Sequence, residues 1–64
     1  MAEKSAFYGL TLGTDISVEE IQTFLGATEV RVASPNTPLT DDYVDSRITI
    51  SINHNRVIRK IVWG

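Results

Sequence analysis

The sequence predicts a small α+β domain. One segment, 17–25, has the three-and-four spacing of apolar residues that is typical of an amphipathic helix. Three others, 29–33, 47–53 and 57–63, read as short strands, and the first two alternate apolar and polar residues. The resulting order of arm, helix, strand, loop, strand, turn and strand predicts the α+β class.

The composition fits a folded chain with a thin core. The 64 residues allow one domain, 1–64, and a chain of this size buries only about 60% of the surface it exposes when unfolded. Apolar residues make up 42% of the chain and charged residues 22%, which is too apolar for a disordered tail. There is no cysteine, so the fold is expected to be disulfide-free and to depend on packing.

The net charge and the absence of long apolar runs argue against some classes of partner. A net charge of −2 gives no positive field for nucleic acid or an anionic membrane, and no apolar run is long enough to span a bilayer. The first residues, Met-Ala-Glu-Lys-Ser, lack the apolar run of a signal peptide, and we expect a soluble chain. Its compartment stays open between the cytoplasm and secretion with the signal removed. We expect a monomer without a cofactor.

The first half of the chain contains an arm and the helix. Residues 1–14 predict an irregular arm with room for a short strand. Ser17 followed by Glu20 predicts a capping box at the helix start, and Gly26 predicts its end, with a longer helix through Ala27 as the alternative. The expected buried stripe comprises Val18, Ile21, Phe24 and Leu25.

Alternating apolar and polar residues predict the strands, and turn-forming residues predict the hairpin between the last two. Segment 29–33 places Val30 and Val32 on one face. Segment 47–53 has the clearest alternation, with its three isoleucines inward and Arg47 and Thr49 on the opposite face. Turn-forming residues separate it from 57–63, which predicts a hairpin.

Segment 34–46 has neither helical nor alternating periodicity. Loops of this length are uncommon in compact domains unless they are functional or disordered. Pro35 and Pro38 restrict the backbone to extended geometry, so we expect a stiff loop. An extended loop held by strands at both ends resembles a protease substrate, although an ordinary surface connection has about equal weight on composition alone.

Other chemistry is weakly indicated. His54 has no second ligand at metal-binding spacing and fits an exposed turn. Asp41, Asp42 and Asp45 lack the bidentate Glu and the permissive Gly of a calcium loop, and so short a chain offers no cleft in which paired carboxylates could act as acid and base. We therefore predict neither an enzyme nor a metal site.

The chain resembles the potato inhibitor I family over roughly residues 15–64. The helix start Ser17-Val18-Glu19-Glu20 is similar to that of the family. Further matches at the expected spacing are Val30, Val32, Thr37, Thr40, Tyr43, Arg47 and Gly64. The stretch from Thr40 to Ile48 is also similar to the fungal and bacterial elastase inhibitors.

This resemblance implies one helix packed on a small mixed β-sheet, with an extended inhibitory loop between two parallel strands. The implied function is reversible, substrate-like inhibition of a serine protease through loop 35–45, with the reactive bond Asp41–Asp42. The residues expected to contact the protease are Pro38, Leu39, Thr40, Tyr43 and Val44. Arg47 is expected to support the loop from below by bonding Asp42 and the Thr40 hydroxyl.

Three departures from the family pattern affect these expectations. Asp41 would put a carboxylate into the specificity pocket, which favours a subtilisin-like or acid-tolerant target over chymotrypsin or elastase. Thr49 stands where plant and leech relatives often have a second supporting Arg, and Trp63 stands where disulfide-bearing relatives have Cys.

The alternative function is a non-inhibitory interaction module, or a folding partner of a protease, on the same scaffold.

Overall fold

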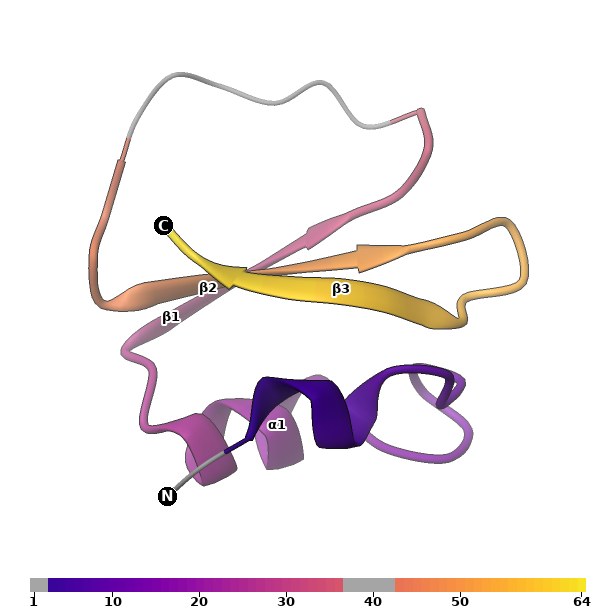
Figure 1. Cartoon of the computed structure of the whole chain (residues 1–64), viewed down its shortest axis with the longest axis horizontal. Coiled ribbons are helices and arrows are strands. Elements are labelled where there is room, and N and C mark those ends of the chain that lie inside the picture. The colour runs from indigo at the N-terminus through magenta and orange to yellow at the C-terminus, as the bar shows by residue number, and fades with distance from the viewer. Residues whose placement is uncertain (1–2, 37–42) are drawn as a thin grey trace.

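The computed structural model describes residues 3–36 and 43–64 of the chain. The helices and strands, in chain order, are η1 (Lys4–Phe7), α1 (Val18–Leu25), β1 (Glu29–Ala33), β2 (Arg47–Ile52) and β3 (Ile58–Trp63). Both helices lie on one side of the sheet (Figure 1). Within the described residues, no helix has the length and apolar character needed to cross a bilayer.

Helix α1 begins and ends where its sequence signals predict. The Glu20 backbone N–H donates to Ser17 Oγ over 3.2 Å, and the Ser17 backbone N–H donates to Glu20 Oε1 over 3.3 Å. This capping box satisfies two backbone donors of the first turn. At the other end Gly26 has φ 73°, a left-handed conformation that glycine adopts without strain, and the shorter of the two predicted helices is correct.

The sheet is mixed, as expected. Its strand order is β1-β2-β3, with β1 and β2 parallel and β2 and β3 antiparallel. Val30 pairs with Ile48, and Ile50 pairs with both Val32 and Ile61, so these side chains share one face. That face packs on α1, which confirms the predicted fold class.

The core is built mainly from isoleucine. The side chains that are at most 1% exposed are Leu12, Ile21, Ile48, Ile50, Ile58 and Ile61. Phe24 was expected in the buried stripe of the helix, but it is 55% exposed. Its ring instead packs against the ring of Phe7 from η1, with the ring centroids 5.2 Å apart and the ring planes at 89°.

The N-terminal arm closes one edge of the sheet. The Gly9 backbone N–H donates to the Ile58 carbonyl, and the Ile58 N–H donates to the Leu10 carbonyl, both over 2.8 Å. The Tyr8 hydroxyl donates to the Ile61 carbonyl and accepts from the Ile61 N–H. The arm, which was expected to be irregular with room for a short strand, thus bonds to Ile58 of β3 through its backbone, and it also contains the 3₁₀ helix η1.

The β2–β3 hairpin turns around Asn53. The Asn53 Oδ1 atom accepts from the backbone N–H groups of Asn55 and Val57, both over 2.9 Å. This side-chain turn shortens both predicted strands by one residue, since β2 ends at Ile52 and β3 begins at Ile58. His54 is exposed here, as predicted.

Candidate functional site

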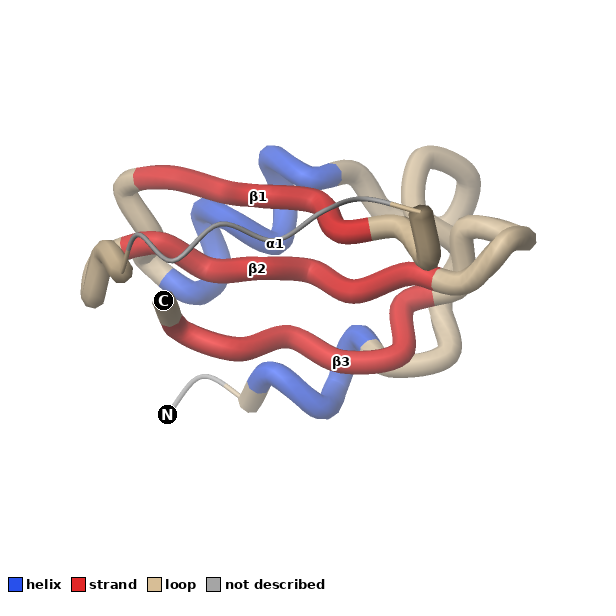
Figure 2. The backbone as a smooth tube through the Cα atoms, turned by 90° about the horizontal axis from the view of Figure 1, so that it is seen from above, coloured by secondary structure: helices blue, strands red, loops and turns tan. Residues whose placement is uncertain are grey.

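The candidate site is the face of the sheet opposite α1. The described ends of segment 34–46 both rise on this side (Figure 1). Because β1 and β2 are parallel, the connection between them has to return along the length of the strands. Figure 2 looks down on this face and shows β2 between β1 and β3, with α1 behind the sheet.

Buried polar residues distinguish this face. Arg47 pairs with Glu29, and Thr49 pairs with Arg31, so both residues of β2 point away from the isoleucine core. Arg47 is only 5% exposed and Thr49 only 7%. A guanidinium that is buried on a sheet face needs polar partners, and Arg47 does take part in interactions. The predicted place of Arg47, on the face opposite Ile48, is confirmed.

The described end of the segment that leads into β2 is bonded to the scaffold. The Ser46 carbonyl accepts from the Thr28 N–H over 2.9 Å, and the Thr28 hydroxyl lies 2.8 Å from Ser46 Oγ. The Arg47 N–H donates to the Val44 carbonyl over 3.1 Å. Together these bonds fix the chain from Val44 to Arg47 against the start of β1. Thr28 carries no local sequence signal for this role, because Ser46 is brought to it only by the parallel pairing of β1 and β2.

Tyr43 is the most exposed large hydrophobic side chain in the described part of the molecule, at 72%. One side of its ring faces Gly64 at the end of β3. Val44 beside it is half-buried. The Tyr43 ring therefore contacts Gly64 on one side, while the rest of its surface is open to a partner. The other predicted site residues, Pro38, Leu39, Thr40, Asp41 and Asp42, lie outside the described residues.

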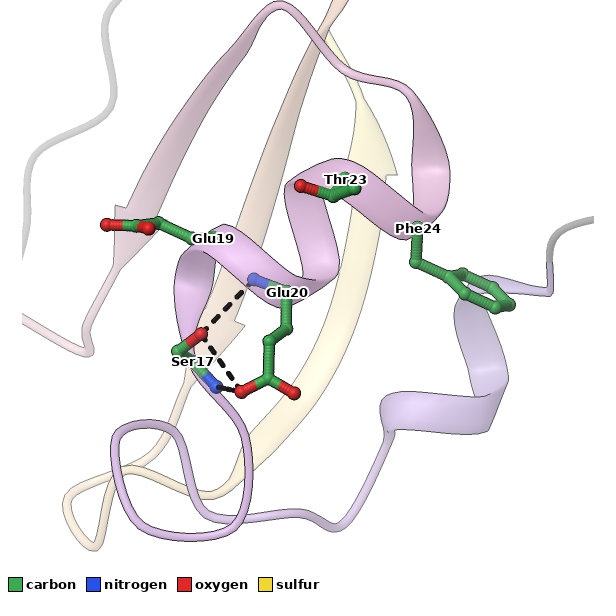
Figure 3. A pocket seen from close by; sticks show the side chains of 5 residues that line it. All are labelled: Ser17, Glu19, Glu20, Thr23 and Phe24. Carbon is green, nitrogen blue, oxygen red and sulfur yellow. Dashed lines mark hydrogen bonds between the residues drawn. The ribbon is translucent and has the colours of Figure 1, made fainter.

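A second feature, a hollow of about 540 Å³, lies on the helical side of the molecule (Figure 3). Its lining residues are Ser17, Glu19, Glu20, Thr23 and Phe24. Figure 3 shows the Glu20 carboxylate folded back on Ser17, where it is used in the capping box. In residues 3–36 and 43–64, no group of His, Asp or Glu side chains is arranged to hold a metal ion.

The fold is similar to a solved protease-inhibitor structure. The elastase inhibitor AFUEI superposes with a TM-score of 0.72, over 95% of this chain and 82% of that chain. The two sequences are 23% identical, so the similarity shows a shared fold and no more. No family model matches the sequence, and no curated protein matches it either.

Proposed function

We propose that the chain is a reversible, substrate-like inhibitor of a serine protease, acting as a monomer through the loop at 35–45. The observation that carries the proposal is that the described loop ends, 34–36 after β1 and 43–46 before the parallel strand β2, lie on the face with buried Arg47. The fold shared with the elastase inhibitor AFUEI supports it. The proposal requires no catalytic residue and no cofactor.

The physical basis is restraint of the loop at its ends. A segment that is already ordered loses little conformational entropy when a protease binds it, so more of the contact energy contributes to affinity. If the protease cuts the loop, the scaffold holds the new ends near each other, and their high effective concentration favours resealing over release. The bonds from Thr28 to Ser46 and from Arg47 to Val44 supply this restraint on the leaving side.

The proposed reactive bond is Asp41–Asp42. Pro38, Leu39 and Thr40 would contact the enzyme on the acyl side, and Tyr43 and Val44 on the leaving side. The exposure of Tyr43 supports its part in this assignment. Arg47 would support the loop through Thr40 and Asp42.

The proposed target is a subtilisin-like or acid-tolerant serine protease. Asp41 would be the residue in the specificity pocket, and a carboxylate is costly to bury there without a basic partner. This argument places elastase among the weaker targets, although AFUEI is itself an elastase inhibitor. The difference is compatible with a shared fold at 23% identity, because the specificity depends on loop residues.

A panel of inhibition constants tests the proposal. The chain is incubated with subtilisin, chymotrypsin, elastase and an acid-preferring serine protease, and its mass is then measured. We expect inhibition of at least one enzyme, with the chain intact or cut only between Asp41 and Asp42. If no enzyme is inhibited and the loop is cut at several bonds, the non-inhibitory interaction module becomes the better assignment.

A further inference from the structure

The contact between Tyr43 and Gly64 joins the loop to the last residue of the described chain. A methyl group at Gly64 would lie 2.5 Å from Cε2 and 2.9 Å from Cδ2 of the Tyr43 ring, closer than carbon atoms approach in proteins. Gly64 also has φ 119°, a conformation that residues with a side chain rarely adopt. The ring therefore sits where only glycine leaves room for it.

Gly64 is itself held by β2 through two hydrogen bonds. Its N–H donates to the Arg47 carbonyl over 2.7 Å, and its carbonyl accepts from the Thr49 hydroxyl over 2.8 Å. Thr49 is only 7% exposed, so water competes little for its hydroxyl. These two bonds place the Gly64 backbone beneath Tyr43, next to the strand that also carries Arg47.

From these contacts we infer that Thr49 and Gly64 are positioning residues for Tyr43, and that they fix the leaving side of the loop. The inference rests on the proposed inhibitory function. Thr49 has a much shorter side chain than arginine, and its hydroxyl donates to the Gly64 carbonyl. Through this indirect route Thr49 supports the loop at the position where plant and leech relatives often have a second Arg.

The arrangement also bears on specificity. One side of the Tyr43 ring contacts Gly64, while 72% of the residue stays exposed. A side chain held in one orientation before binding loses less rotamer freedom when a protease contacts it. Tyr43 is the second residue after the proposed reactive bond. The target protease therefore needs a surface that accommodates an aromatic ring at this position.

The test compares Thr49→Val, which removes the hydroxyl at similar size, with Thr49→Ser, which retains it. Nuclear Overhauser effects between the Tyr43 ring and the Gly64 Hα atoms report the contact without any protease. We expect Thr49→Val to weaken them, to speed amide exchange at Val44, and to weaken inhibition by roughly two- to tenfold, the equivalent of one hydrogen bond. Thr49→Ser should keep all three properties.

Gly64→Ala provides an independent variant, because it acts on the ring directly and leaves Thr49 in place. We expect it to remove the Tyr43 contact and to raise the rate at which an inhibited protease cuts the loop. Unchanged Overhauser effects and amide exchange in Thr49→Val and Gly64→Ala would overturn the positioning role. A parent chain that inhibits no protease while these variants lose the contact would overturn the proposed function alone.

Discussion

At the scale of single residues, Tyr8 replaces part of a neighbouring strand at the edge of β3. Its hydroxyl lies 3.2 Å from the Ile61 carbonyl and 3.1 Å from the Ile61 nitrogen, and it acts as donor to the first and acceptor from the second. An edge strand with unpaired backbone groups can pair with another chain. One side chain thus satisfies two backbone groups of β3, and the backbone of the arm pairs with Ile58 of the same strand.

Tyr8→Phe should destabilise the protein, because both groups of Ile61 lose their partner while the ring can still pack. We expect a loss of about 1–3 kcal/mol in the free energy of unfolding, measured by urea titration. The substitution should speed hydrogen exchange at the Ile61 amide more than at the Ile50 amide, because the Tyr8 hydroxyl bonds to Ile61. Equal exchange of Ile61 in parent and variant would contradict this role for Tyr8.

The proposed specificity residue is tested by a pair of substitutions. Asp41→Leu replaces a carboxylate with an apolar side chain, and we expect inhibition of chymotrypsin to strengthen by about tenfold or more, because no charge is then buried in the pocket. Asp41→Asn removes the charge at nearly constant shape and separates charge from size. Unchanged selectivity in both variants would mean that another residue enters the pocket.

At the scale of elements, α1 lies on the side of the sheet away from the candidate site. Ser17→Ala removes the cap of this helix and should cost about 0.5–2 kcal/mol of stability without altering inhibition. Thr23→Ala in the same helix is the matched control, since Thr23 is exposed and alanine has the higher helix propensity. Thermal unfolding and the inhibition constant are measured for both. Weaker inhibition by folded Ser17→Ala would show that the two faces are coupled.

The elements that sequence predicts well are those with a local signal. The capping box at Ser17, the stop at Gly26 and the alternation of β2 each depend on neighbouring residues, and the structure contains all three. The N-terminal arm has no such period. Its bonds to β3 join residues that are distant in sequence, such as Gly9 and Ile58, so the sequence allowed a short strand there without indicating what it pairs with.

The candidate site shows the same division between local and tertiary information. Alternation along β2 places Arg47 on the face opposite Ile48, and the structure agrees. The contact of Tyr43 with Gly64 depends on where β3 ends relative to β2, which no local pattern encodes. For Phe24 the local pattern was misleading. Its spacing fits the buried stripe of the helix, but the residue is 55% exposed and its ring packs on Phe7 from η1.

At the scale of the whole molecule, stability comes from a small core without covalent cross-links. At about 0.05–0.15 kcal/mol per residue, a chain of 64 residues is expected to have a free energy of unfolding of roughly 3–10 kcal/mol. Ile50 lies in the central strand and is 0% exposed. A single large cavity at this position can therefore remove much of the total.

Ile50→Ala and Ile50→Val test how far the inhibitory face depends on this core. Ile50→Ala should cost about 2–5 kcal/mol and Ile50→Val about 0.5–1.5 kcal/mol, both measured by urea titration. Neither side chain reaches the loop face, so the folded form of each variant should bind a protease as the parent does. Apparent inhibition by Ile50→Ala should then weaken in proportion to its folded fraction.

The two causes of lost inhibition can be separated by an osmolyte. Trimethylamine N-oxide favours the compact state, so it should restore inhibition by Ile50→Ala, whose folded fraction is low. It should not restore Thr49→Val, whose defect lies in the orientation of Tyr43 within a folded molecule. A folded Ile50→Ala that still inhibits poorly in the osmolyte would mean that packing beneath β2 also sets the geometry of the loop face.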